Sequence, residues 1–207
     1  MPFIMGYKSI ISMALSDQGQ IKKQYGLSPF DPMILFAGRL TIQKGPDLLL
    51  RAFPSVLRHH CDAKVIFAGE GDMRGKLERQ AQKMGIHHAC RFIGFKQGSE
   101  LVDLFRACDM VAVPSRNEPF GIVILEAWSA GKPVVATHNG GPSEFVWHDV
   151  TGIKVDAEPY SIAWGICELL RNSGHGFWMG QNGRYAAETA FSWDTIACHT
   201  EQVYHSV

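Results

Sequence analysis

Short apolar runs and longer segments with helical periodicity alternate along most of this chain. The apolar runs are about four to six residues long and fall at residues 33–37, 63–68, 90–94, 110–113, 133–137 and 152–155. Runs of this length that are apolar almost throughout are typical of strands that are covered on both faces. The pattern therefore predicts six strands of a parallel sheet.

Between these runs, apolar residues recur every three or four positions, which is the period of an amphipathic helix. Pro54 lies inside one such segment and can kink its helix, and Ser99 and Ser192 are the expected N-caps of two others. The predicted helices span residues 20–25, 46–59, 73–84, 101–108, 120–130, 141–147, 159–172, 177–190 and 192–205.

Strands that alternate with helices indicate an α/β fold. We expect a Rossmann-like three-layer sandwich, in which a six-stranded parallel sheet lies between helices on both faces. The predicted domain takes residues 31–207, after an N-terminal segment or linker remnant at residues 1–30. The mildly apolar opening is interrupted by Lys8 and lacks a small-residue cleavage site. We interpret it as the leftover of a longer chain, or as a short docking segment, rather than a signal peptide.

Composition narrows the possible partners of the protein. The 207 residues suit one domain, or one and a fraction. Twenty basic and twenty acidic residues cancel, so the chain has no general attraction for nucleic acid or for an anionic membrane. No run approaches the roughly 18 apolar residues of a membrane span.

Cysteine and histidine are expected to have no functional role. The five cysteines are an odd number without a Cys-x-x-Cys pair, which favours free thiols and a cytoplasmic location. The adjacent histidine pairs at 59–60 and 87–88 lie near predicted helix ends, where cations are favourable. Because neighbouring residues rarely face one ligand together, we expect no metal site.

The candidate chemistry begins after the fourth predicted strand. The sequence from Pro114 to Ala127 turns through a Glu-Pro-Phe-Gly corner into a helix, and it places Glu118 in the loop and Glu126 in the helix. A strand that ends in a polar loop and runs into a helix is how an open α/β sheet forms a ligand crevice. The backbone N–H groups of Phe120, Gly121 and Ile122 would favour a phosphate there.

A second candidate loop follows the first predicted strand. Gly38 lets the backbone approach a ligand closely, Arg39 offers a planar guanidinium fork, and Lys44 offers a movable ammonium. The two cations suffice to neutralise a diphosphate without a metal. The spacing alone leaves an alternative open, in which Arg39 pairs with a carboxylate at the edge of the core and Lys44 is a solvated charge.

Two further loops can border the same crevice. Gly69-Glu70-Gly71 closes the second predicted strand and either shapes the floor of the cleft or simply turns the chain. The Gly-rich turn at residues 139–144 is expected to line the edge of the cleft, with His138 a bystander beside it.

Taken together, these residues resemble a known signature. The string S-x-x-E-P-F-G-I-x-x-L-E-A at residues 115–127, with Gly38-Arg39 and Lys44-Gly45 upstream, resembles that of retaining glycosyltransferases of family four. This group includes bacterial and archaeal glycogen synthases, and the resemblance covers residues 30–207. It implies the GT-B architecture, in which two Rossmann-like domains face each other across a cleft. This chain resembles the C-terminal, donor-binding domain of the two.

The resemblance also implies a reaction and roles for single residues. A hexose would pass from an ADP-, UDP- or GDP-sugar to an acceptor hydroxyl with its anomeric configuration retained, and no metal would be required. Glu126 would accept hydrogen bonds from the ribose, and Glu118 would bind hydroxyls of the donor sugar rather than act as a covalent nucleophile. The implied catalytic residues are Arg39, Lys44 and Glu118, and the implied donor-binding residues are Gly38, Phe95, Phe120, Gly121, Ile122 and Glu126.

Several alternatives stay open at this point. A sugar-nucleotide epimerase on the same scaffold fits the E-P-F-G-I string less well, and a phosphorylase with pyridoxal phosphate lacks a matching lysine motif. A non-catalytic nucleotide-binding module is the rival from another class. If the family reading holds, this chain by itself is an inactive fragment without its N-terminal acceptor domain. Its last helix, which carries Trp193, Ile196 and Tyr204, would then cross onto that domain; the alternative is that it packs on its own.

Overall fold

The structure of the protein is a computed structural model that describes residues 18–205. The opening segment that we interpreted as a leftover of a longer chain lies outside the described residues. Six strands form one sheet, in the order β3-β2-β1-β4-β5-β6, and every neighbouring pair is parallel. The strands are β1 (Met33–Ala37), β2 (Lys64–Ala68), β3 (Cys90–Gly94), β4 (Met110–Val113), β5 (Val134–Thr137) and β6 (Gly152–Val155). The predicted parallel sheet is confirmed.

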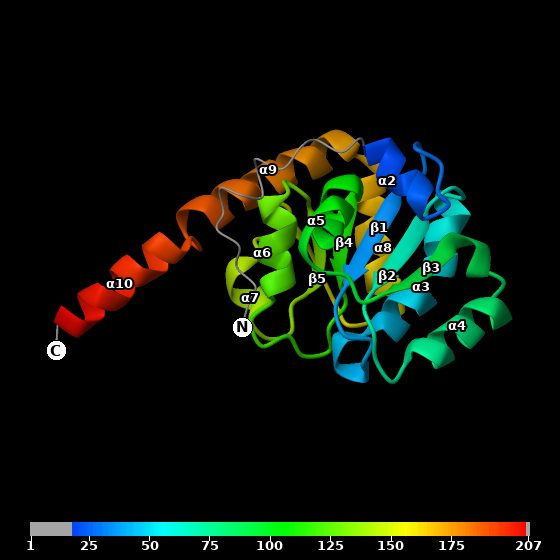
Figure 1. The fold of residues 1–207 in the computed structure, drawn as a ribbon, viewed down its shortest axis with the longest axis horizontal. Coiled ribbons are helices and arrows are strands. Elements are labelled where there is room, and N and C mark those ends of the chain that lie inside the picture. Colours follow the sequence, from blue (N-terminus) through cyan, green and yellow to red (C-terminus); the bar gives the residue numbers. More distant parts are fainter. Residues whose placement is uncertain (1–17, 206–207) are drawn as a thin grey trace.

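Helices cover both faces of this sheet (Figure 1). Their bounds are α2 (Gln18–Gln24), α3 (Pro46–His59), α4 (Arg74–Lys83), α5 (Gly98–Ala107), α6 (Ile122–Ser129), α7 (Pro142–Phe145), α8 (Pro159–Arg171), α9 (Ser173–Thr189) and α10 (Trp193–His205). Two 3-10 turns, η1 (Ile42–Lys44) and η2 (His87–Ala89), complete the order.

The strands bury both of their faces, which explains why they are apolar throughout. In β1, Ile34 and Phe36 belong to one core cluster, whereas Met33 and Leu35 belong to the other. The first cluster lies under α3, α4 and α8, and the second lies under α2, α5, α6 and α9. Alternate residues of a strand point to opposite faces, so a run without polar positions fills two cores at once. The three-layer sandwich is confirmed.

The described part of the predicted linker packs closely on the domain. Ile21 of α2 and Leu27 after it are 3% and 4% exposed, and both belong to the second core cluster. The ammonium of Lys22 lies 3.0 Å from a carboxylate oxygen of Asp109 and donates a hydrogen bond of 2.8 Å to the carbonyl of Asp31. These contacts fix α2 against the loops that precede β1 and β4.

Two of the predicted helix ends differ in the structure, and one predicted N-cap is confirmed. Ser99 is not an N-cap: α5 already begins at Gly98, after Gln97, whose side chain makes no capping bond. The helix predicted at 141–147 is the single turn α7, because the backbone becomes extended at Val146. Ser192 does cap α10, since its hydroxyl oxygen accepts a 3.1 Å hydrogen bond from the N–H of Thr195.

The last helix leaves the sandwich. Figure 1 shows α10 extending away from the sheet beyond the end of α9, and none of its described residues is buried. Trp193, Ile196 and Tyr204 are 59%, 38% and 79% exposed. The alternative in which this helix packs on its own domain is therefore wrong, whereas its contact with another domain stays a prediction. Among residues 18–205, no helix has both the length and the apolar character needed to cross a membrane.

Candidate functional site

The candidate site lies where the strand order reverses. β1 and β4 are neighbours at the centre of the sheet, with Leu35 opposite Val111. The strand that follows β1 in the chain, β2, lies on one side of this pair, and the strand that follows β4, β5, lies on the other side. Ligands of open α/β sheets bind outside the carboxyl ends of the strands at such a switch point. The loops after β1 and β4 carry the two sets of residues that the sequence singled out.

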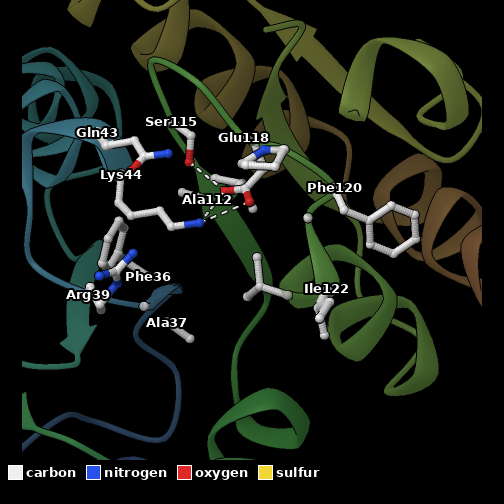
Figure 2. A pocket seen from close by; sticks show the side chains of 15 residues that line it. Phe36, Ala37, Arg39, Gln43, Lys44, Ala112, Ser115, Glu118, Phe120 and Ile122 are labelled. Carbon is white, nitrogen blue, oxygen red and sulfur yellow. Dashed lines mark hydrogen bonds and ion pairs between the residues drawn. The ribbon is translucent and has the colours of Figure 1, made fainter. Parts of the chain in front are cut away.

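Two hollows open at this edge of the sheet. The first, of about 390 Å³, is lined by residues of both loops and the start of α6 (Figure 2). The second, of about 530 Å³, lies between the loops after β1, β2 and β3 and includes Glu126. Ala37, Gly38 and Arg39 line both hollows, so the two share a common wall.

The first hollow contains a buried ion pair. The ammonium of Lys44 donates hydrogen bonds of 2.9 and 2.8 Å to the two carboxylate oxygens of Glu118, and the Ser115 hydroxyl donates one of 2.9 Å. Figure 2 shows both side chains pointing at this carboxylate. Glu118 is only 4% exposed. The alternative in which Lys44 is a solvated charge is therefore wrong.

Helix α6 begins at the wall of this hollow. Gly121 precedes it with a φ of 98°, a conformation that glycine adopts without steric cost. No side chain caps this end, and among residues 18–205 nothing accepts a hydrogen bond from the N–H groups of Ile122 and Val123. Because the helix dipole adds a partial positive charge here, the open end favours an anion.

Arg39 stands at the wall between the two hollows. Its side chain is exposed, and its guanidinium has no hydrogen-bond or ion-pair partner within the described part of the chain. No carboxylate among the described residues pairs with Arg39, so the alternative of an ion pair at the edge of the core is wrong there. Gly38 next to it runs so close to Gly69 that a Cβ on Gly69 would overlap the Gly38 carbonyl. This crowding requires glycine at position 69, and the Gly38 N–H joins the two segments by a 3.0 Å hydrogen bond to the Ala68 carbonyl.

The second hollow contains an unpaired carboxyl group and an exposed aromatic ring. Glu126 lies on the first turns of α6 and finds no hydrogen-bond partner for its carboxyl among the described residues. Burial raises the pKa of Glu126 from 4.5 to about 7. Phe95 lines the same hollow and is 63% exposed. Gly69, Glu70 and Gly71 line it too, which confirms that this turn shapes the floor of the cleft.

The Gly-rich turn at 139–144 packs against the loop that carries Glu118, and its place at the edge of the cleft stays a prediction. None of its residues lines either hollow. Instead, the carbonyl of Asn139 accepts a 3.2 Å hydrogen bond from the N–H of Glu118, and the N–H of Gly141 donates one of 2.8 Å to the Glu118 carbonyl. The turn therefore supports the backbone that carries Glu118. His138 lies 3.5 Å from Asp156 and lines neither hollow, and its role as a bystander stays a prediction.

Three residues brace this site for which the sequence analysis assigned no role. Ser115 bonds Glu118, and Arg116 forms a two-pronged ion pair with Asp47, with distances of 2.8 and 2.7 Å. Arg116 and Asp47 are 69 positions apart, so no local pattern could have paired them. Between residues 18 and 205, no cluster of three or more histidine, cysteine, aspartate or glutamate side chains could hold a metal ion.

Comparison with known proteins identifies the family of the chain. The sequence pattern of the family described as "Glycosyl transferases group 1" matches residues 17–185. The chain is 41% identical over 195 residues to an uncharacterized glycosyltransferase of Methanocaldococcus jannaschii, covering 94% of this chain and 50% of that protein. It is 33% identical over 172 residues to glycogen synthase of Mycobacterium tuberculosis, covering 83% of this chain and 42% of the relative. The chain spans about half the length of the curated relatives that it matches.

Solved structures give the same picture. The Anabaena protein HepE, in complex with UDP and glucose, superposes with a TM-score of 0.85 at 27% identity, over 96% of this chain and 55% of HepE. The C-terminal domain of a group 1 glycosyl transferase from Francisella tularensis superposes with a TM-score of 0.79 at 26% identity. That match covers 89% of this chain and 97% of the solved domain. The predicted family resemblance and the Rossmann-like fold are confirmed.

Proposed function

This chain belongs to the group 1 glycosyl transferases, and on that premise we propose that its domain at residues 31–207 binds a nucleoside diphosphate sugar. The bound molecule is the donor from which a hexose passes to an acceptor hydroxyl with retention of its anomeric configuration. The domain contributes the donor side of the reaction, and the remaining length of the relatives corresponds to the acceptor side.

The pair of joined hollows carries this proposal. A sugar nucleotide has a nucleoside at one end, a sugar at the other and a diphosphate between them. Arg39, which lines both hollows, stands where the diphosphate of such a molecule would lie. The likeness to HepE, which was solved in complex with UDP-glucose, supports the same class of ligand.

We assign the first hollow to the diphosphate and the sugar. Arg39 and Lys44 supply positive charge, and the open N–H groups at the start of α6, near Phe120, Gly121 and Ile122, face the same space. When the bond to the sugar breaks, negative charge develops on the leaving diphosphate, and preorganised cations stabilise it without reorganisation. These two cations replace a metal ion in the proposed mechanism.

Glu118 then binds hydroxyls of the donor sugar. Two of its carboxylate contacts come from Lys44 and a further one from Ser115, which fix the side chain before the donor arrives. A carboxylate has about four lone-pair positions, so it can accept additional sugar hydroxyls while it keeps these bonds. Its ion pair with Lys44 suits this binding role better than that of a free nucleophile.

We assign the second hollow to the nucleoside. Glu126 offers an unpaired carboxyl group, which in its ionised form can accept two hydroxyl donors from the vicinal diol of a ribose. Phe95 offers an exposed ring in the same hollow, against which a nucleobase can lie. Both residues keep the roles that the family resemblance implies.

A binding measurement tests the proposal directly. The chain is titrated with ADP, UDP and GDP in a calorimeter, and its thermal unfolding is followed with the same ligands. A ligand at roughly 100 times its dissociation constant should stabilise the fold by about 2.7 kcal/mol. Absence of both heat and thermal shift with all three diphosphates at millimolar concentration would overturn the proposal. An epimerase is distinguished by testing the full-length protein for conversion of the donor sugar without an acceptor.

A further inference from the structure

Arg116 lies between the two loops that make the first hollow, but it does not line either hollow. It follows Ser115 directly, and its side chain is turned toward α3 and η1 rather than toward the ligand space. A residue in this position cannot contact a ligand in these hollows. Its effect on the site must come through the loops that it joins.

Four hydrogen bonds from Arg116 cross to the loop that carries Lys44. Its N–H donates to the carbonyl of Gln43 at 2.8 Å, and its Nη1 donates to the carbonyl of Ile42 at 2.7 Å. The guanidinium also meets both carboxylate oxygens of Asp47, with Nη1 at 2.8 Å and Nη2 at 2.7 Å. These contacts hold Ile42 and Gln43, which precede Lys44, and Asp47, three residues after it at the start of α3.

The pairing with Asp47 is strong for a position near the surface. The Asp47 side chain is only 14% exposed, and that of Arg116 is 34% exposed. Burial opposes ionisation of Asp47, but the hydrogen bonds and charge of Arg116 outweigh it, so the pKa of this carboxyl is lowered. The same hydrogen bonds raise the pKa of Arg116. A parallel two-pronged contact of this kind fixes orientation as well as distance.

We infer that Arg116 is a positioning residue for the diphosphate: it sets how far the loop with Lys44 stands from the loop with Glu118. The inference rests on the proposed function of the same site. When a diphosphate arrives, Lys44 must share its donors between Glu118 and phosphate oxygens, which weakens the direct tie between the loops. The Arg116–Asp47 clamp does not involve the ligand, so it keeps the loops in place at that moment.

A calorimetric comparison tests this inference on the whole chain. ADP, UDP and GDP are each titrated beside the matching nucleoside into the unmodified chain and into Arg116→Ala. We expect the variant to bind its best diphosphate about tenfold more weakly, because a cation displaced by a fraction of an ångström loses much of its contact. Nucleoside affinity should change less than about twofold, since the second hollow is untouched. Arg58→Ala is the control: Arg58 is exposed on α3, and within the described part of the chain its side chain bonds only Ser55 one turn away, so its loss should change neither affinity.

The same measurement in a Lys44→Ala background separates positioning from a general structural effect. If Arg116 acts through Lys44, removing it from a chain that already lacks Lys44 should cost less than about twofold in diphosphate affinity. Equal losses in both backgrounds would overturn the inference. So would an unchanged diphosphate affinity in Arg116→Ala, or equal losses for diphosphate and nucleoside.

Arg116→Lys covers the case in which the alanine variant does not fold, because lysine keeps the charge but lacks the planar fork. Arg116→Lys should also lower the affinity for the diphosphate more than that for the nucleoside. A diphosphate affinity equal to that of the unmodified chain would count against the inference. If the unmodified chain binds no diphosphate at all, the proposed function fails and this inference falls with it. If the unmodified chain binds and Arg116→Ala binds equally well, only the inference is overturned.

Discussion

Lys44 and Glu118 are 74 positions apart in the chain, yet the ammonium of one lies 2.8 and 2.9 Å from the two carboxylate oxygens of the other. The Glu118 side chain is 6% exposed and that of Lys44 is 23% exposed. A carboxylate buried to this degree needs its partners, because water is not available to replace them. The pair therefore stabilises the fold as well as shaping the site.

We predict that Lys44→Ala lowers the free energy of unfolding by about 1–3 kcal/mol, the usual cost of leaving a buried charged group short of a partner. Urea denaturation of the variant measures this loss. Adding Glu118→Gln to the same chain should restore much of it, since an amide is neutral and can still bond the Ser115 hydroxyl. Equal stability of Lys44→Ala and the unmodified chain would contradict the prediction.

Unlike Lys44, Arg39 should contribute to ligand binding without contributing to the stability of the fold. Because its guanidinium has no partner among residues 18–205, Arg39→Ala should leave the free energy of unfolding unchanged to within about 0.5 kcal/mol. Diphosphate binding should weaken by about 1.5–3 kcal/mol, the range for a hydrogen bond to a charged group. Titrations with ADP and adenosine, or the matching pair for another base, check this. Equal shifts for diphosphate and nucleoside would show that Arg39 does not contact the diphosphate. Arg79→Ala, a change at an exposed arginine of α4, serves as the control.

Glu126 should make stability depend on pH. Its pKa in the folded chain is about 7 against an ordinary 4.5. Below pH 4.5 the group is protonated in both states, and its burial carries no charge penalty. Between pH 4.5 and about 7 the unfolded chain releases this proton whereas the folded chain keeps it, so stability falls across this window and levels off above it. The free energy of unfolding of Glu126→Gln, relative to that of the unmodified chain, should therefore rise by up to about 3 kcal/mol between pH 4 and pH 8. Parallel curves of unfolding free energy against pH would refute this.

Glu126 should also release a proton when a ribonucleotide binds. Ribose hydroxyls donate to the ionised carboxylate, so they should lower the pKa of Glu126 and expel its proton near pH 7. Calorimetric titrations at pH 6.5 in two buffers with different heats of ionisation measure the proton count. Glu126→Gln should abolish the release and reduce the preference for a ribonucleotide over its 2′-deoxy analogue. A release that persists in this variant would assign the proton to another group.

Gly121→Ala should damage both fold and site. With φ at 98°, an alanine there is strained by about 1–2 kcal/mol. Its Cβ would also lie 3.1 Å from Cδ1 of Ile124 and 3.4 Å from Cγ of Glu118. Gly85→Ala is a matched control: Gly85 has a φ of 70°, but among residues 18–205 no heavy atom beyond its two chain neighbours lies within 4 Å of an added Cβ. Both variants should lose stability in thermal melts, and only Gly121→Ala should also lose diphosphate affinity. Equal diphosphate affinities in the two variants would contradict this.

The purified 207-residue chain should bind donor without transferring sugar. Transfer requires an acceptor hydroxyl within about 3–3.5 Å of the anomeric carbon and a site closed to water. On the proposed function, the half of the relatives that this chain does not match supplies both. Product analysis with a bound donor and a panel of saccharide acceptors measures turnover, and a domain corresponding to that unmatched half, fused or added in trans, should restore it. Appreciable transfer by the chain alone would refute this division of labour.

The sequence by itself determined the elements of the fold. The apolar runs and the helical spacing predicted every strand of the sheet and the approximate place of each described helix. Both patterns are local: a strand buried on two faces needs apolar residues at every position, and an amphipathic helix needs them every three or four. The same locality placed the loops after β1 and β4 at one edge of the sheet, because all parallel strands end on the same side. Helix ends were less predictable, as Ser99 shows, because a loop's geometry decides where the first turn closes.

Only the tertiary structure decided which of these loops touch and what surrounds each charge. The Lys44–Glu118 and Arg116–Asp47 pairs exist because β1 lies next to β4, and strand order is a property of the whole sheet rather than of any segment. Burial raises the pKa of Glu126 because the surrounding chain takes water away from it, which spacing along a helix cannot reveal. The exposed course of α10 likewise depends on what lies beside it in space. The sequence predicted which residues are candidates for the site. It could not predict their contacts, their burial or the shift in the pKa of Glu126, because these depend on neighbours that are distant in the chain.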